Sequence, residues 1–346
     1  MAYATGDELV DKPKDPALAR KWKTIKRVSK RELTEFGKIK VTLVAFQHQI
    51  TDAFPLEFNL PGWVIINFAD RDKYKTDYYL QINVDKPGNE KDETYRYIRN
   101  TGKPYLVCEL SCFRENSYKG DPDNWYFTLG WFHFLRQGFF YNNGCPPDRW
   151  NKIKEIQNIK VEPWNSAVDK KDYALICLQK VNDSTMIPMH ETHGKYRNWV
   201  LLVVNQIRNL YPKMPIMIRP HLRTKEASYK KISEMFGLIT ISETWENRSF
   251  FEGGAGLQQD IDGARFVVSY NSNVLTQCVL MGKPAVCWDI RSMAAPGCLD
   301  PSQMHDISLV HGIKRDSWLA NLGYTQWSRA EIRDGDAWAH LKQYGF

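Results

Sequence analysis

Three consecutive small polar residues, Asn271, Ser272 and Asn273, have the types and the spacing to bind an anion. They follow the apolar run at residues 265–269, which is typical of a strand buried on both faces. Apolar residues then recur through residues 274–281 at close to the helical period of 3.6. The free N–H groups and the dipole at the start of a helix favour negative charge, and phosphate in particular. The sequence therefore predicts a phosphate-binding turn at these three residues.

An ordinary capped helix would begin with the same residue types, because Asn and Ser are common N-caps in helices that bind nothing. A second strand end favours the binding interpretation. Residues 215–223 form an apolar strand that ends in Arg219, His221 and Arg223. In an open parallel sheet, ligands bind at the carboxyl ends of the strands. We therefore expect these basic side chains to lie near the polar turn.

These two motifs resemble the C-terminal domain of GT-B glycosyltransferases, particularly those of the capsular-polysaccharide type. In that family a strand ends in a His-Pro motif, where this chain has His221-Leu222. An Asn-Ser pair then precedes a helix that ends in Gly-Lys-Pro, as Asn271-Ser272 and Gly282-Lys283-Pro284 do here. The resemblance covers residues 170–300. It implies two Rossmann-like domains that face each other across a cleft, with a nucleotide-sugar donor bound by the second domain.

The resemblance also implies roles for individual side chains. His221 is expected to act in catalysis beside the leaving phosphate. Glu109, at the end of an apolar strand in the first domain, is the candidate base for the acceptor hydroxyl, with a salt-bridged loop acid as the alternative. A UDP-sugar is the favoured donor and a CMP-sugar the alternative. The residues expected to bind the donor are Ser184, Arg219, Arg223, Asn271, Ser272 and Asn273.

Transfer of this kind is expected to need no metal ion. An Asp-x-Asp motif at a strand end would indicate a metal site, and the chain has these letters at Asp70-Arg71-Asp72. That motif follows a strand of the first domain, and we interpret it as a solvated turn. Metal-independent transfer also agrees with the resemblance to GT-B enzymes.

The composition excludes a membrane-spanning protein and a disulfide scaffold. Of the 346 residues, 43% are hydrophobic and 25% charged, and the length suffices for two domains of ordinary size. No run approaches the ~20 apolar residues of a membrane span. The seven cysteines form no Cys-x-x-Cys pair, so we expect reduced, buried thiols. With no signal-like N-terminus, the chain is predicted to be cytoplasmic.

Strands alternate with helices on both sides of a charged, polar join at residues 165–172, which predicts two parallel sheets with right-handed crossovers. Near the end of the chain, Ser328 and Glu331 have the spacing of a capping box at the start of a helix. We expect four parts, namely a basic arm (residues 1–31), an acceptor-side domain (32–168), a nucleotide-sugar domain (169–326) and a C-terminal helix that crosses back to the first domain (327–346).

The acceptor is predicted from charge. The net charge is +7, and residues 20–31 include seven basic side chains. Such an arm suits contacts to a phosphate backbone, although a solvated face would have the same composition. Residues 327–341 also resemble the end of bacteriophage-encoded proteins of this glycosyltransferase-like group. We therefore predict transfer to a hydroxymethylated pyrimidine, flipped out of double-stranded phage DNA in the host cytoplasm.

Two alternatives stay open. The first is a capsule or lipopolysaccharide glycosyltransferase that uses a CMP- or UDP-sugar, which the motif at His221 favours. The second is a non-catalytic nucleic-acid-binding protein, which the polar turn at Asn271 disfavours, because binding DNA needs no nucleotide pocket.

Overall fold

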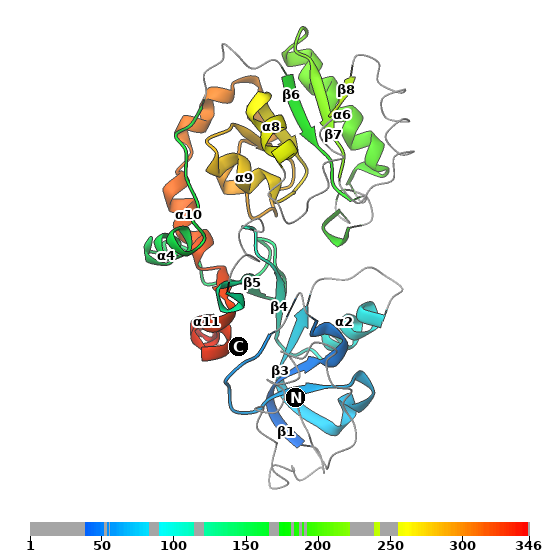
Figure 1. The fold of residues 1–346 in the computed structure, drawn as a ribbon. Helices are drawn as coiled ribbons and strands as arrows, with labels where there is room; N and C mark the ends of the chain where they lie inside the picture. Colours follow the sequence, from blue (N-terminus) through cyan, green and yellow to red (C-terminus); the bar gives the residue numbers. More distant parts are fainter. Residues whose placement is uncertain are drawn as a thin grey trace. The chain divides into compact units, whose positions relative to one another are not determined.

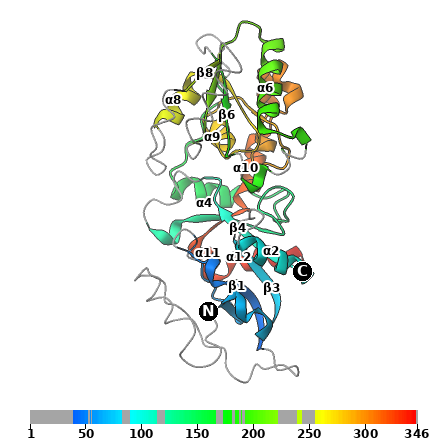
Figure 2. The ribbon, with the colours of Figure 1, turned by 90° about the vertical axis from the view of Figure 1, so that its right-hand side faces the viewer.

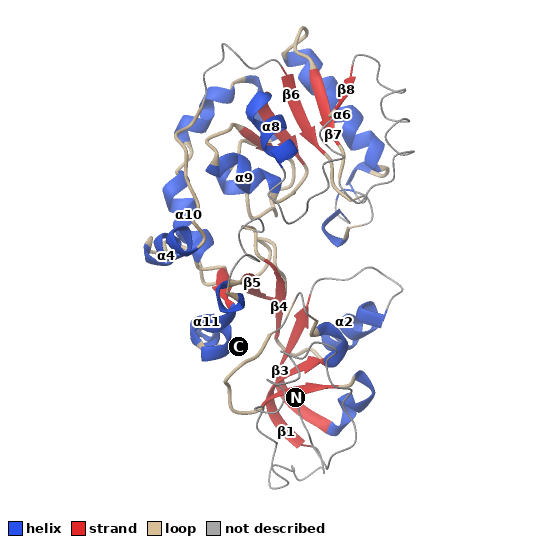
Figure 3. Cartoon of the chain, viewed as in Figure 1, coloured by secondary structure: helices blue, strands red, loops and turns tan. Residues whose placement is uncertain are grey.

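The chain divides into two compact units that differ from a simple division of the sequence into halves. Unit 1 comprises Met1–Ser111, Lys119–Asn142 and Thr325–Phe346, and unit 2 comprises Cys112–Tyr118 and Asn143–Tyr324. Each unit has one β-sheet with helices against it (Figures 1 and 3), which confirms the α/β class with two Rossmann-like units. The computed structural model describes residues 39–51, 54, 56–82, 90–113, 121–165, 173–180, 183–186, 189, 192–221, 239–242 and 255–344. The basic residues 20–31 lie outside this set.

The sheet of unit 1 has six strands in the order β11-β5-β4-β3-β1-β2. Strands β1 to β4 run parallel to one another, and β5 runs antiparallel to both β4 and β11. The strands are β1 (Ile39–Phe46), β2 (Trp63–Ile66), β3 (Tyr74–Ile82), β4 (Tyr105–Leu110), β5 (Tyr126–Trp131) and β11 (Gln326–Ser328). The helix α2 (Glu90–Asn100) connects β3 to β4.

Strand β3 lies inside the sheet, although alternating polar and apolar residues are often found in edge strands. It pairs with β1 on one side and β4 on the other. Exposed and buried residues alternate only in its first part, and Tyr79, Leu80, Gln81 and Ile82 are all buried. The alternation therefore arises because one face of the first part of β3 is exposed to solvent, and not because β3 is an edge strand.

The last part of the chain completes the core of unit 1. Ser328 and Glu331 form the predicted capping box, since each side chain accepts a hydrogen bond from the other residue's backbone N–H. The Trp131 indole N–H donates to the Leu341 carbonyl oxygen at 2.8 Å, which ties this segment to β5. Two helices follow β11, namely α11 (Arg329–Asp334) and α12 (Asp336–Leu341).

The sheet of unit 2 has five parallel strands in the order β10-β9-β6-β7-β8. Counted within unit 2, this order is 5-4-1-2-3, which is the doubly wound order of dinucleotide-binding folds. The direction of winding reverses between β6 and β9, the position where such sheets bind ligands. The strands are β6 (Tyr173–Cys177), β7 (Ile216–Arg219), β8 (Ile239–Ile241), β9 (Ala264–Ser269) and β10 (Ala285–Cys287).

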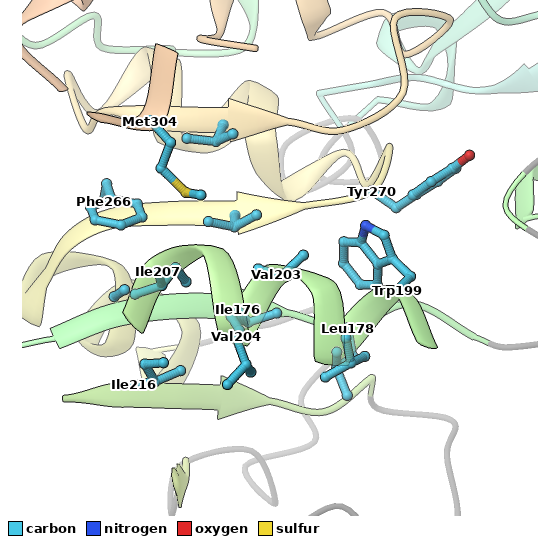
Figure 4. Packing of buried hydrophobic residues seen from close by; sticks show 14 of the residues in the cluster. Ile176, Leu178, Trp199, Val203, Val204, Ile207, Ile216, Phe266, Tyr270 and Met304 are labelled. Carbon is cyan, nitrogen blue, oxygen red and sulfur yellow. The ribbon is translucent and has the colours of Figure 1, made fainter. Parts of the chain in front are cut away.

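Helices cover both faces of this sheet. In Figure 2, α6 lies on one side of β6 and α8 on the other. The apolar face of α6, including Trp199, Val203 and Ile207, packs against Ile176 and Phe266 of the sheet (Figure 4). The helices of unit 2 are α4 (Asp148–Ile156), α6 (Tyr196–Leu210), α8 (Ala255–Gly263), α9 (Val274–Leu280) and α10 (Arg315–Gly323).

Short 3₁₀ helices fill many of the connections. In unit 1 these are η2 (Gln47–Gln49), η3 (Phe68–Lys73), η4 (Pro122–Asn124) and η11 (Lys342–Tyr344). In unit 2 they are η6 (Ser184–Met186), η8 (Ala295–Gly297), η9 (Pro301–His305) and η10 (Ile307–Gly312). None of the helices in the described part of the chain is long and apolar enough to span a membrane.

The division between the units differs from the predicted boundary after residue 168. Helix α4, which was expected in the first domain, packs against α10 in unit 2. A Cβ atom at Gly323 would lie 2.9 Å from the Trp150 backbone nitrogen, so the two helices are in close contact. The join at residues 165–172 was chosen for its polar sequence, whereas the core on which α4 packs is set by side chains distant in sequence.

Candidate functional site

Asn271 connects the loops that leave three neighbouring strands of unit 2 at their carboxyl ends. Its Oδ1 accepts a hydrogen bond from Gln179 Nε2 at 2.7 Å, and its backbone N–H donates to Gln179 Oε1 at 2.9 Å. Its Nδ2 donates to the Thr185 carbonyl oxygen at 2.9 Å and to Asp289 Oδ2 at 3.0 Å. The residue is buried, and both polar atoms of its side chain are bonded. Asn271 therefore positions these loops, whereas the sequence predicted a direct ligand of the donor.

Asp289 extends this network to a cationic side chain. Its Oδ1 accepts hydrogen bonds from Arg291 Nε at 2.7 Å and from the Arg291 backbone N–H at 3.0 Å. The Asp289 side chain is 3% exposed and that of Arg291 is 34% exposed. A buried carboxylate thus orients a guanidinium group that solvent can reach. Arginine binds phosphate or carboxylate groups with two parallel N–H donors.

Tyr270 directly precedes Asn271 and lies beside the same network. Its side chain is buried, and its carbonyl oxygen accepts a hydrogen bond from the Asp289 backbone N–H at 2.9 Å. Burial, and then the negative charge of Asp289, raises the pKa of Tyr270 to about 12. The hydroxyl group therefore stays protonated at physiological pH.

The turn at Ser272 and Asn273 has two backbone donors without a partner in the described part of the chain. Ser272 Oγ accepts from the Val274 N–H at 3.3 Å, and the carbonyl oxygens of Ser272 and Asn273 accept from the next turn of α9. The backbone N–H groups of Ser272 and Asn273 have no hydrogen-bond partner among the described residues. Both residues are half-buried and directly follow Asn271. Adjacent backbone N–H groups without a partner among the described residues are donors that can bind an anion.

Arg219 was expected to bind the donor phosphate, which stays a prediction, and the structure shows which side chains it contacts. Its side chain is buried and forms an ion pair with Asp260 of α8. It also donates to Ser242 Oγ at 3.1 Å, and that hydroxyl donates to Asp260 Oδ2 at 2.5 Å. A buried cation has to be paired to offset the loss of hydration. Arg219 therefore connects β7 to the residue after β8 and to α8.

The other predicted site residues are distributed over both units. His221 lies two residues beyond the end of β7 and is half-buried. Ser184 begins η6, and Arg223 lies outside the described residues. Glu109 belongs to β4 of unit 1, where its Oε1 accepts from the Leu110 N–H at 2.7 Å. The catalytic roles of His221 and Glu109 stay predictions.

The Gly-Lys-Pro motif that ends α9 has a packing role. Gly282 has a φ of +66°, and a Cβ atom there would lie 1.9 Å from the Pro163 carbonyl oxygen. Lys283 is buried, and its Nζ donates to the carbonyl oxygens of Ala264 at 2.7 Å and Asp262 at 3.3 Å. These carbonyls lie at the C-terminal end of α8, where a cation also offsets the helix dipole. The motif therefore joins α8, α9 and the segment around Pro163.

Three members of the network were not selected from the sequence. They are Gln179, Asp289 and Arg291, which lie two residues past β6 and two and four residues past β10. The signal that selected Asn271, a polar residue just after an apolar strand, applies equally to them. Asp289 lies one residue beyond Trp288, and β10 ends at Cys287, so this aspartate also stands at the end of a strand.

The structure describes Asp70 and Asp72 in η3 of unit 1. Asp70 forms an ion pair with Lys73 at 2.7 Å, and the Lys73 side chain is 63% exposed. Among the described residues, no group of three or more His, Cys, Asp and Glu side chains is arranged to hold a metal ion.

No protein-family model and no curated protein matches this sequence. Two solved structures of KpsC from Thermosulfurimonas dismutans are similar to it. The structure described as beta Kdo 2,4 transferase has a TM-score of 0.49 and 12% identity, over 82% of this chain and 90% of that chain. The structure described as beta Kdo 2,7 transferase has a TM-score of 0.47 and 14% identity, over 88% of this chain and 100% of that chain. Similarity of fold does not carry an activity from one chain to another.

Proposed function

We propose that this protein is a GT-B glycosyltransferase that binds a nucleotide-sugar donor at the carboxyl ends of β6, β9 and β10. The observation that carries this proposal is the orientation of Arg291 by Asp289, which is itself bonded to Asn271. Asn271 directly precedes Ser272 and Asn273, whose backbone N–H groups have no partner among the described residues. When the bond between sugar and phosphate breaks, negative charge grows on the leaving phosphate. Donors that are already oriented stabilise this charge without reorganising during the reaction.

The charge of the site favours a donor with a single phosphate. Within the described residues of the network, Arg291 supplies the cation, because Asp260 already pairs with Arg219. A CMP-sugar carries one negative charge on its phosphodiester, whereas the diphosphate of a UDP-sugar carries two. The resemblance of the motif at His221 to capsular-polysaccharide enzymes supports the same choice. We therefore propose a CMP-sugar in preference to the UDP-sugar that the sequence first favoured.

For the acceptor we propose a saccharide of the capsule or lipopolysaccharide kind. The alternative acceptor, hydroxymethylated pyrimidine in DNA, depends on residues 20–31 and on the net charge of +7. Residues 20–31 lie outside the described residues. Glu109 is the proposed base for the acceptor hydroxyl, and His221 is proposed to act at the leaving phosphate.

Donor binding can be measured by thermal shift and calorimetry with CMP, UDP, GDP and their sugars. A ligand that binds only the folded state raises the melting temperature, increasingly so as its concentration rises above the Kd. We expect CMP and CMP-sugars to stabilise the protein most, and Arg291→Ala to abolish that effect. Arg265→Ala is the matched control, because it removes an arginine at the opposite end of β9 from the site. The Arg265 guanidinium stacks on Tyr211, and Tyr211 contacts Phe266 near the start of β9. The proposal is wrong if no nucleotide binds, or if Arg291→Ala binds as the wild type does.

The acceptor is tested by transfer of a labelled sugar. One arm of the experiment supplies capsule or lipopolysaccharide oligosaccharides, and the other supplies duplex DNA that contains hydroxymethylcytosine or hydroxymethyluracil. We expect label on the saccharide alone, with loss of transfer but not of donor binding in Glu109→Gln. Label on the modified DNA alone would restore the DNA interpretation.

A further inference from the structure

The winding of the unit 1 sheet also reverses, between β1 and β3. Strand β1 pairs with β2 on one side, and β3 and then β4 continue the sheet on its other side. In such an arrangement ligands bind at the carboxyl ends of the two strands that flank the reversal. The corresponding position in unit 2, between β6 and β9, is the proposed donor site. Unit 1 therefore contains a second position of the same kind.

A pair of side-chain amides joins the two flanking strands in each unit. In unit 2 the pair is Gln179 and Asn271. In unit 1, Gln49 follows β1, and its Nε2 donates to Oε1 of Gln81 in β3 at 3.0 Å. Gln81 Nε2 donates in turn to the Ile82 carbonyl oxygen at 3.1 Å. Both glutamines of unit 1 are buried. The two reversal points are thus connected in the same way.

Gln49 has one polar atom without a partner. Its Oε1 is buried and accepts no hydrogen bond from the described residues, and the residue is 1% exposed. Buried polar atoms without a partner are uncommon in folded proteins, and each has a cause in the structure or in the function. An acceptor at a ligand-binding position is satisfied when the ligand brings an O–H or N–H group.

His48 presents a ring that solvent can reach in the same turn. It is half-buried and lies in η2. Its Nε2 hydrogen-bonds with the Thr94 hydroxyl group of α2 at 3.2 Å, and its ring stacks on Phe46 with 6.3 Å between the centroids and 19° between the planes. Helix α2 lies beside β3 (Figures 1 and 2) and packs on β1 through Tyr97, which meets Phe46 edge-on. The imidazole is therefore held in one orientation at the strand end.

The ends of β1, β3 and β4 suit a ligand that carries hydroxyl groups better than an anion. Their polar side chains are amides, hydroxyls, an imidazole and a carboxylate, contributed by Gln47, His48, Gln49, Gln81, Glu109 and Ser111. No Lys or Arg belongs to the described residues at these ends, whereas Arg291 supplies a cation in unit 2. A hydroxyl group both donates and accepts, so it can pair with an amide oxygen or with an imidazole nitrogen.

We propose that His48 and Gln49 bind hydroxyl groups of the acceptor saccharide at the reversal point of the unit 1 sheet. The assignment rests on the proposed function where it names that saccharide as the acceptor. The register of the sheet brings the proposed base to the same edge, since Gln81 lies opposite Val107 and Glu109 follows two residues later on β4. Neighbouring strands lie about 4.8 Å apart. A hydroxyl group held by His48 and Gln49 is thus bound at the sheet edge to which Glu109 also belongs.

The first measurement is NMR of the histidine rings during titration with saccharides. The probes are capsule and lipopolysaccharide oligosaccharides together with the methyl glycosides of glucose, galactose and N-acetylglucosamine. Among the signals of the eight histidines, that of His48 is identified by its loss in His48→Ala. We expect at least one of these saccharides to shift the His48 signal. The Kd values for CMP and UDP are measured separately on the same protein.

The second measurement is the Kd for that saccharide in His48 variants. His48→Ala should weaken binding about tenfold, as expected when one hydrogen bond is lost. His48→Gln keeps a side chain that can hydrogen-bond and should recover part of the affinity. The matched control is His340→Ala. His340 is also half-buried, and its Nε2 hydrogen-bonds with the Tyr141 carbonyl oxygen at 2.9 Å, but it packs on Trp327 of β11, the strand at the other end of the sheet. That control should bind the saccharide as the wild type does.

Gln49→Met tests the second residue of the site. Methionine keeps the length of the side chain and removes both polar atoms, so we expect weaker saccharide binding here too. The melting temperature of each variant establishes that it is folded. Unchanged saccharide binding in a folded Gln49→Met protein would remove Gln49 from the site.

The outcomes separate this proposal from the donor site. If no saccharide shifts the His48 signal, or if His48→Ala binds as the wild type does, the acceptor site is wrong whatever the nucleotide result. Equal weakening in His48→Ala and His340→Ala would show a general loss of structure and would overturn it as well. Saccharide binding at His48 in a protein that binds neither CMP nor UDP supports the saccharide site and overturns the proposed donor site.

Discussion

Gln179 and Asn271 exchange two hydrogen bonds, of 2.7 Å and 2.9 Å, at the point where the winding of the unit 2 sheet reverses. The segments that follow the two strands turn away in opposite directions at such a point, which opens the sheet edge to a ligand. The paired amides connect these segments at that position. Asn271 then extends the connection to Asp289 and so to Arg291.

Asn271→Ala should destabilise unit 2 more than the substitution of an exposed polar residue does. It leaves Gln179, the Thr185 carbonyl and Asp289 each short of one partner, and the lost bond is buried at Asp289 and partly buried at the other two. Unmade buried hydrogen bonds cost about 1–3 kcal/mol each, so we expect the free energy of unfolding to fall by roughly 2–4 kcal/mol in urea titrations. The control is Gln258→Ala, which removes an exposed amide bonded to Asp262 at 3.1 Å and should change stability by less than about 0.5 kcal/mol. Equal effects of the two substitutions would contradict the role of Asn271.

Gly282→Ala and Gly144→Ala separate backbone strain from steric conflict. The two glycines have φ values of +66° and +65°, so alanine strains both backbones similarly, by about 1–2 kcal/mol. A Cβ atom at Gly144 meets nothing within 4 Å, whereas at Gly282 it meets the backbone of Pro163. We therefore expect Gly282→Ala to lower the melting temperature well beyond Gly144→Ala. Similar shifts would mean that the segment at Pro163 moves aside easily.

Arg219 and Asp260 should behave as a buried ion pair and not as donor ligands. Arg219→Met leaves the Asp260 carboxylate buried without its cation, which costs about 3–5 kcal/mol of stability. The double variant Arg219→Met/Asp260→Leu removes both charges and should regain much of that loss in urea titrations. Normal stability together with loss of nucleotide binding in Arg219→Met would restore the original role.

Cys145 should be the first cysteine that alkylates. All seven thiols are free, and Cys145 is half-buried while the other six are buried. Burial, and then the charge of Asp148, raises the pKa of Cys145 above its ordinary value. Since only the thiolate reacts, labelling should still accelerate as the pH rises above 9. Asp148→Asn lowers that pKa and should speed labelling at pH 8, as measured by mass spectrometry. Uniform labelling of several cysteines in the native protein would contradict this order.

The features that were predictable from the sequence are those with local causes. The capping box of Ser328 and Glu331 depends on residues three apart and was found. The alternation of strands and helices gave the α/β class, because each element carries its own period. The turn at Ser272 and Asn273 was located at a strand end for the same reason.

The features that were missed depend on partners far apart in sequence. Arg219 pairs with Asp260, which lies forty-one residues later in the sequence, and no local sequence pattern predicts that contact. The network around Asn271 needs Gln179, ninety-two residues earlier. Likewise, the unit to which α4 belongs is decided by its packing on α10 and not by the polar sequence between them.

The discontinuity of unit 1 imposes an order on synthesis at the ribosome. Its sheet includes β11, and its core includes Trp327, Trp338 and Leu341. All of these residues are made after Tyr324, the last residue of unit 2. A chain that emerges from its N-terminus can therefore finish the second unit before the first. The apolar side chains of the early strands of unit 1, including β1, stay uncovered until the end of the chain has been made. That waiting period is when a newly made chain of this protein is most exposed to aggregation and most in need of a chaperone.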